Sequence, residues 1–376
     1  MRMSHFVELA LALWIQGKPV TICLLGKPGI GKTSAARALA AAMTEHARTR
    51  NPESPAALCW VQDLTSSAPE DINGLPFRSN GCTHYDPQEW LLDFCRPGAY
   101  GVICLDDLTQ ASSAMQVAAR PLCLERRSQR STISDNVVII VTGNRREDKS
   151  NASTLPAHFR NSVLMLDIDV DVDEWCNWAG AQPDIDPVVT AFLRWKTTHL
   201  AQTPAEADAK HGSFATPRTW AMLGRAYKVA SDKNALVDVA HGLVGEGVGT
   251  EFLAFARLRD SLVDPKEVLR NPKSAVPNPK ATLDTPDKMI AMVTSIAEHT
   301  IIAMREGGKD GKKEAPTAFL KALAWVTQGG REYVATAMAT YTSNGGQVPT
   351  LVAAVKANHT NPELAGLMDF LGRTFK

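Results

Sequence analysis

The 376-residue sequence has no excess charge of either sign, few aromatic residues and no long apolar run. Its 40 Lys and Arg balance 40 Asp and Glu, so the broad positive charge with which many proteins hold nucleic acid is missing, although a local basic patch is compatible with this balance. Aromatic residues make up 6% of the chain, but 44% is hydrophobic, which suffices for an ordinary core and excludes disorder as the dominant state. No stretch of about 20 apolar residues occurs, so we expect no membrane span.

The seven cysteines form no C-x-x-C pair and no compact framework. This spacing is typical of reduced thiols and disfavours a structural zinc site. The apolar stretch from Phe6 to Ile15 is interrupted by Glu8 and leads directly into a glycine-rich motif, so we do not interpret it as a signal peptide. We therefore expect a cytoplasmic protein.

Five apolar runs in the first half of the chain have the composition of buried parallel strands. They span residues 19–25, 57–61, 101–105, 137–141 and 163–170, and helices are predicted at 5–16 and 33–47. The alternation of such runs with helical or loop-rich stretches predicts an α/β core with a doubly wound parallel sheet.

Strand signals stop near residue 180, which divides the sequence into three predicted parts. These are an α/β core (1–180), an all-helical domain (181–265) and a proline-rich linker with a helical C-terminal extension (266–376). The prolines between Asp264 and Asp287 exclude a long helix there. We expect loops at 306–313 and 343–346 and see no internal repeat. The amphipathic helices expected at 289–304 and 317–325 suit either packing on a partner or a simple extension of the helical domain.

The glycine-rich motif from Gly26 to Thr33 reads GKPGIGKT and fits the phosphate-loop pattern G-x-x-x-x-G-K-S/T in full. It lies between a predicted strand and a predicted helix, where backbone N–H groups can turn toward phosphates. Lys32 would place its charge near the β and γ oxygens, and the Thr33 hydroxyl can ligate Mg²⁺. The predicted residues of this ATP site are Gly26, Pro28, Gly29, Gly31, Lys32, Thr33 and Ser34.

Two carboxylates, Asp106 and Asp107, end the predicted strand at 101–105. Asp106 would hold Mg²⁺ together with Thr33, and Asp107 would orient the attacking water. Many ATPases have a glutamate at the second position, and aspartate is one methylene shorter. We therefore predict that the protein hydrolyses ATP, with slow turnover as an alternative. A second alternative is that the two carboxylates are only an acidic strand end and have no catalytic role.

Asn144 follows the predicted strand at 137–141. Its amide both donates and accepts hydrogen bonds, so it could bridge the γ-phosphate and the attacking water. A turn residue is the alternative for an isolated asparagine, but its position after the phosphate loop and the two carboxylates favours the site.

In this order the motifs resemble those of an AAA+ ATPase, and in detail those of the MoxR group, over roughly residues 10 to 265. The stretches that carry the resemblance are 17–20, 26–33, 71–76, 105–111, 124–127, 135–137, 142–145 and 215–220. The resemblance implies an AAA+ P-loop core, an all-α lid and a homo-oligomeric ring, usually of six, with ATP and Mg²⁺ bound between neighbours. It also implies that Asn144 is the sensor-1 residue and Arg218, at the start of a lid helix, is sensor 2.

Such rings need an arginine from the adjacent subunit to stabilise charge on the transferred phosphate. Arg160 is the first choice, although the family's usual position lies nearer Ser162. Arg145 and Arg146 remain alternatives, and Arg126 and Arg127 are weaker ones.

Two segments resemble insertions of the family. Residues 71–88 would form a loop that faces the pore of the ring, and residues 124–136 a hairpin before sensor 1; ordinary surface loops are the alternative for both. The alternating aspartates at 167, 169, 171 and 173 lack the glycine and glutamate of a calcium loop and predict a solvated strand face. Trp175 and Trp178 are expected to be core anchors.

Three functions fit these observations. The resemblance implies a MoxR-type ATPase that hydrolyses ATP at the subunit interfaces of a ring and remodels a protein client, together with a partner that carries a von Willebrand A domain. A DNA- or RNA-associated AAA+ motor or loader is disfavoured by the balanced charge. The third function is an ATP-gated scaffold with little hydrolysis. The short side chain of Asp107 is compatible with this alternative.

Overall fold

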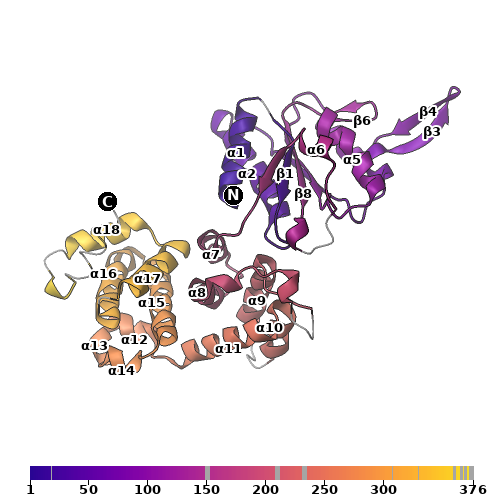
Figure 1. Ribbon diagram of the computed structural model, residues 1–376. Coiled ribbons are helices and arrows are strands. Elements are labelled where there is room, and N and C mark those ends of the chain that lie inside the picture. Colours follow the sequence, from indigo (N-terminus) through magenta and orange to yellow (C-terminus); the bar gives the residue numbers. More distant parts are fainter. Residues whose placement is uncertain are drawn as a thin grey trace. The chain divides into compact units, whose positions relative to one another are not determined.

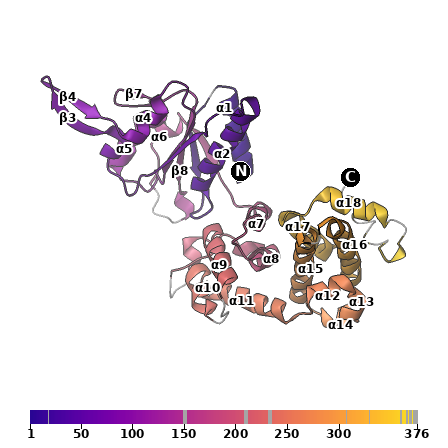
Figure 2. The same cartoon turned by 180° about the vertical axis from the view of Figure 1, so that it is seen from behind.

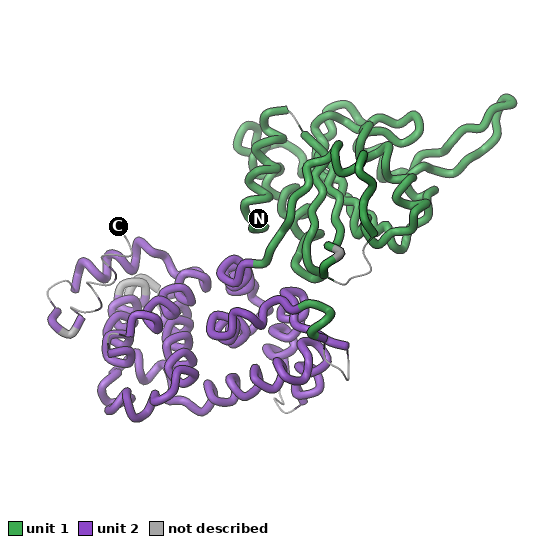
Figure 3. Tube along the Cα trace, viewed as in Figure 1, with its two compact units in different colours: residues 1–170, 203–206 green, residues 171–202, 207–376 purple. Residues whose placement is uncertain are grey.

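The computed structural model describes residues 1–17, 19–148, 153–207, 212–230, 235–306, 308–328, 330–358, 361–364, 367 and 371. They form two compact units (Figure 3). The first contains Met1–Val170 and Thr203–Glu206, and the second contains Asp171–Gln202 and Ala207–Lys376. The division lies at residue 170 and not near 180, so the helix at Val172–Gly180 groups with the helical part of the chain.

The first unit is built on a parallel sheet that contains β1 and β8 (Figure 1). The sheet has five strands in the order β2-β5-β8-β1-β9. Its strands are β1 (Ile22–Leu25), β2 (Leu58–Asp63), β5 (Gly101–Asp106), β8 (Val137–Gly143) and β9 (Leu164–Asp167). The predicted parallel sheet is confirmed, and the carboxyl ends of β1, β5 and β8 meet at one edge. At this edge Leu25 lies opposite Gly143, and Leu105 lies opposite Val141.

Alternate residues of the strands build two apolar layers. Ile22 and Leu24 pack with α1 (Met3–Ile15) and α2 (Lys32–Arg50), whereas Cys23 packs on the opposite face. That face is covered by α3 (Glu70–Asn73), α4 (Glu89–Cys95), α5 (Ser113–Glu125) and α6 (Ala157–Arg160). A sheet buried on both faces explains why its strands are continuously apolar in sequence.

Most of the segment expected as a loop at 71–88 is a β-hairpin that projects from the first unit (Figures 1 and 2), and only its first residues belong to α3. The hairpin consists of β3 (Leu75–Ser79) and β4 (Cys82–Asp86), joined by Asn80 and Gly81, both with positive φ (50° and 73°). An Asn-Gly pair is a strong hairpin signal, which the sequence interpretation overlooked. The predicted hairpin within 124–136 is confirmed as β6 (Arg127–Ser128) and β7 (Ser131–Thr132).

The second unit is all-helical in its described residues. Its α-helices are α7 (Val172–Gly180), α8 (Pro187–Trp195), α9 (Pro217–Val229), α10 (Leu236–Val244), α11 (Glu246–Ser261), α12 (Pro265–Arg270), α13 (Pro272–Ala275), α14 (Pro279–Thr282), α15 (Pro286–Glu306), α16 (Gly308–Thr327), α17 (Arg331–Ser343) and α18 (Val348–Ala357). Short 3₁₀ turns occur at Thr197–His199 and Pro362–Leu364 in this unit, and at Arg146–Asp148 and Pro204–Glu206 in the first unit. Among the described residues, none of the helices combines the length and the apolar character that a membrane span requires.

Three local expectations were wrong. Most of the loop expected at 306–313 is helical, because α16 begins at Gly308. The strand expected at 163–170 ends at Asp167, and Asp171 instead caps α7 through the Glu174 N–H (2.9 Å). Trp175 is buried as expected, but Trp178 is 45% exposed, since it lies on the outer side of α7.

The proline-rich segment folds as three consecutive short helices that share one pattern, α12, α13 and α14. Each begins with Pro-Lys, and the side chain before each proline accepts a backbone N–H of the first turn. These capping residues recur every seven positions, as Asp264, Asn271 and Asn278. The sequence therefore does contain a short internal repeat, which anchors on the core around α15 and α16 through Val268, Val276 and Leu283.

Candidate active site

The phosphate-loop motif connects the end of β1 to the start of α2. Gly29 and Gly31 have positive φ (73° and 98°), which orients the turn that leads into the helix. A Cβ on Gly26 would lie 2.6 Å from the carbonyl oxygen of Ile168, so this position has no room for a side chain. The loop thus ends at the N-terminus of a 19-residue helix, where backbone N–H groups favour an anion.

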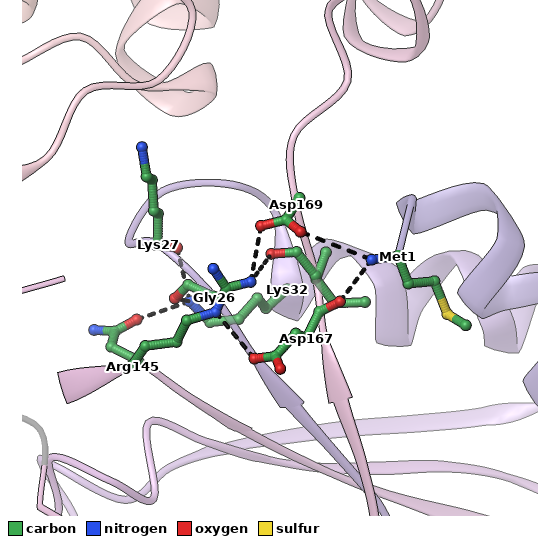
Figure 4. Close-up of polar contacts among 9 residues, drawn as sticks. Met1, Gly26, Lys27, Lys32, Arg145, Asp167 and Asp169 are labelled. Carbon is green, nitrogen blue, oxygen red and sulfur yellow. Dashed lines mark hydrogen bonds and ion pairs between the residues drawn. The ribbon is translucent and has the colours of Figure 1, made fainter. Parts of the chain in front are cut away.

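Lys32 is buried, with 6% of its surface exposed. Its Nζ donates to the carbonyl oxygens of Gly26 and Lys27 (both 2.9 Å), which Figure 4 shows. It also donates to Oδ1 of Asn144 (2.8 Å). The structure therefore brings together the phosphate-loop lysine and the predicted sensor-1 asparagine, which are 112 positions apart in sequence.

Thr33 and Asp106 form the second part of the site. The Thr33 hydroxyl lies 2.9 and 2.8 Å from the two carboxylate oxygens of Asp106. A hydroxyl and a carboxylate at this distance fit a Mg²⁺ ion, which takes one or two protein oxygens and completes its shell with phosphate and water. When bound, the ion would neutralise charge on the phosphates.

Asp107 has φ of 57°, a left-handed backbone conformation that residues other than glycine rarely adopt. Its N–H donates to Oγ1 of Thr142 (3.0 Å), and its carbonyl oxygen accepts the N–H groups of Gln110 and Ala111 (3.0 and 3.1 Å). The chain turns sharply at the residue predicted to orient water.

Asn144 is 5% exposed and held from two sides. Besides its contact with Lys32, its backbone N–H donates to Oγ1 of Thr109 (2.9 Å). A Cβ on Gly143 would meet the Thr109 side chain at 2.6 Å, so a glycine is needed where β8 passes Thr109. Sequence reasoning missed Thr109, because its partner comes from another strand.

The Arg145 side chain is held by hydrogen bonds and ion pairs within the first unit. It donates to Asp167 (3.0 Å) and Asp169 (2.8 Å), as drawn in Figure 4, and also to the Ile168 carbonyl oxygen (3.0 Å). The hydrogen bond from Arg145 lowers the pKa of Asp169 below its ordinary value. Asp167 and Asp169 thus form ion pairs in addition to facing solvent. These ion pairs hold the Arg145 side chain, which was an alternative for the arginine that acts on a neighbouring subunit.

The remaining arginines differ in their surroundings. Arg126 donates to the carbonyl oxygens of Ser134 and Val137 (both 2.7 Å), and Arg127 pairs with Glu125 (2.6 Å). The side chain of Arg146 lies outside the described residues. Arg160, at the end of α6, is exposed and forms no ion pair with the described part of the chain.

Arg218 lies in the first turn of α9, in the second unit, and is exposed. The turn is fixed by Pro217 at its first position and by a reciprocal capping box between Thr216 and Thr219. Its approach to a γ-phosphate stays a prediction, as does the role of exposed Ser34 and of Pro28 in nucleotide binding.

Residues 21–160 match the sequence family described as an AAA domain of the dynein-related subfamily. The first unit therefore carries an AAA domain. With its phosphate loop and five-stranded parallel sheet, it has the AAA+ P-loop fold that the motifs predict. A search of curated proteins found no match.

Several solved structures are similar to this chain over part or most of its length. A protein of Cytophaga hutchinsonii assigned as an ATPase is 16% identical with a TM-score of 0.30, covers 44% of this chain and is itself covered over only 46% of its length. A RuvB variant of Thermotoga maritima is 14% identical, with 75% of this chain and 82% of that one covered and a TM-score of 0.38. PCH-2 of C. elegans is 14% identical, with 67% of this chain and 66% of that one covered and a TM-score of 0.34.

Proposed function

We propose that this AAA+ protein is an ATPase of MoxR type that works as a ring and remodels a protein client. One observation carries the proposal: Lys32 bonds Asn144 and Thr33 bonds Asp106, which joins the start of α2 to the ends of β8 and β5. Convergent groups of these types bind the phosphates of ATP and stabilise charge on the transferred group. Asp107 would orient the water.

Arg160 is our candidate for the arginine that acts on the neighbouring subunit's ATP. Its exposure and its lack of an ion pair with the described residues suit a side chain that reaches outward. Arg145 suits this role less, because two aspartates of its own unit hold it. Arg218 would serve as sensor 2.

The β3–β4 hairpin is our candidate for contact with the client in the pore of the ring. Leu75, Phe77 and Tyr85 are 60%, 42% and 43% exposed, so this two-stranded hairpin presents large apolar side chains to solvent. A partner with a von Willebrand A domain remains part of the MoxR proposal.

Parallel measurements of ATP turnover and particle mass, with and without DNA, test the function. We expect a hexamer-sized particle whose turnover is indifferent to DNA and is abolished in Lys32→Ala. Lys280→Ala, which changes an exposed lysine of the second unit, is the matched control and should behave as wild type.

The other outcomes separate the alternatives. Stimulation by DNA would replace the remodelling proposal with a nucleic-acid motor, and assembly without turnover would replace it with an ATP-gated scaffold. A monomer without Lys32-dependent turnover would contradict all three.

A further inference from the structure

The end of β8 approaches both acidic residues of the candidate site through one side chain, Thr142. This threonine has no solvent exposure and lies two positions before Asn144. Its hydroxyl donates to Oδ1 of Asp106 (2.5 Å) and accepts the backbone N–H of Asp107 (3.0 Å). Its carbonyl oxygen accepts the N–H of Leu108 (2.9 Å). Thr142 thus contacts three successive residues of the neighbouring strand end.

The contact with Asp106 restricts how that carboxylate can rotate. Thr33 approaches the carboxylate from the phosphate loop and Thr142 approaches it from β8, so Asp106 is hydrogen-bonded from two different elements. Hydrogen bonds of this kind orient the ligands of a metal ion and affect its affinity strongly.

The contact with Asp107 acts on the backbone. The left-handed conformation at Asp107 costs free energy for a residue with a Cβ, so it persists only where its surroundings hold it. The bonds from the N–H groups of Asp107 and Leu108 to Thr142 supply such a hold. Since the aspartate side chain is short, the direction of its Cα–Cβ bond largely determines where its carboxylate lies.

We propose that Thr142 is a positioning residue that sets the orientation of Asp106 and of Asp107 together. This role involves no contact between Thr142 and the nucleotide. The single hydroxyl of Thr142 couples the residue that would hold Mg²⁺ to the residue that would orient water. The proposal rests on the proposed ATPase function, because it assigns these two roles to the aspartates.

Thr142→Val tests the proposal, because valine keeps the shape of threonine and removes the hydroxyl. Mn²⁺ affinity of the ADP-bound protein, measured by electron paramagnetic resonance, should fall roughly 10- to 100-fold, the usual effect of losing a hydrogen bond to a metal ligand. ATP turnover should fall as well, whereas ADP affinity in EDTA should stay close to wild type. Thr142→Ser should restore both properties.

Thr21→Val is the matched control. Thr21 is also a buried threonine of the first unit, and its hydroxyl bonds the Cys123 carbonyl oxygen at the opposite end of β1. If Thr142→Val only lowered stability, it would behave like Thr21→Val. A fall in Mn²⁺ affinity that occurs in Thr142→Val and not in Thr21→Val therefore supports the positioning role.

The outcomes distinguish this proposal from the proposed function. If wild type binds Mn²⁺·ADP and hydrolyses ATP while Thr142→Val does both equally well, the positioning role is wrong and the ATPase proposal stands. If wild type does neither, the ATPase proposal itself fails. If Thr142→Val and Thr142→Ala both lose the folded first unit, Thr142 is a structural residue and the inference is overturned.

Discussion

Asp106 and Asp107 are neighbours in sequence but are held in different ways. The carboxylate of Asp106 is bonded by Thr33 and Thr142, whereas Asp107 is fixed through its backbone. The first arrangement suits a metal ligand of constant orientation, and the second fixes the direction in which the Asp107 side chain leaves the backbone.

Asp107→Asn keeps the size of the side chain and removes its charge. We expect nucleotide affinity in Mg²⁺ to stay near wild type and the single-turnover rate of hydrolysis to fall by roughly 10²- to 10⁴-fold, the usual contribution of a general base. Asp106→Asn is the comparison and should instead weaken the Mg²⁺-dependent part of nucleotide binding. An unchanged hydrolysis rate in Asp107→Asn would show that Asp107 has no catalytic role.

At the scale of elements, α11 and α15 are joined by a buried ion pair. Arg259 on α11 donates to Glu298 on α15 and to the Ser295 hydroxyl (2.7 Å). Burial raises the pKa of Glu298 above its ordinary value, and Arg259 offsets this only in part, while the nearby charge of Asp186 at the start of α8 adds to the rise. The helices of the predicted lid and of the C-terminal extension therefore share one buried charged group.

This raised pKa predicts how the stability of the second unit depends on pH. A carboxyl with a raised folded-state pKa stabilises the fold fully below the unfolded value, about 4.3, and this contribution is lost as the pH rises through the folded value. Urea unfolding should therefore show the free energy of unfolding of wild type falling, relative to Glu298→Gln, from about pH 4 upward. Glu332→Gln, at an exposed position of α17, should leave the pH dependence of wild type unchanged. Parallel curves for wild type and Glu298→Gln would contradict the prediction.

At the scale of the whole molecule, the ring proposal requires that one ATP site draws side chains from two copies of the chain. Lys32 would act on the nucleotide of its own subunit and Arg160 on that of its neighbour. A closed ring of identical head-to-tail contacts provides this pairing at every interface.

Mixing two inactive variants tests this pairing. Lys32→Ala and Arg160→Ala should each lose ATP turnover, but equal amounts mixed before assembly should regain about a quarter of wild-type turnover, the share of interfaces that combine two intact side chains. Arg130→Ala, which changes an arginine of the turn between β6 and β7, serves as the control and should be active alone. Two variants that stay inactive when mixed would rule out Arg160 as the arginine that acts across the interface.

The sequence alone determined the parts of this protein that depend on local pattern. The phosphate-loop spacing, the apolar strands ending in Asp106 and in Asn144, and the helical second half all follow from neighbours in the chain, because glycine freedom and hydrophobic periodicity are local properties. The Asn80-Gly81 turn and the seven-residue proline repeat were also local signals, which a closer reading of the sequence could have found.

Only the tertiary structure decided which distant side chains meet. Thr142 reaches Asp106 and Asp107 because β8 lies beside β5 in the sheet, and the pairing of Arg145 with Asp169 and of Arg259 with Glu298 likewise joins separate elements. An isolated threonine or arginine has no distinguishing pattern in sequence. Its partner is set by the order of strands and the packing of helices, which are properties of the folded chain.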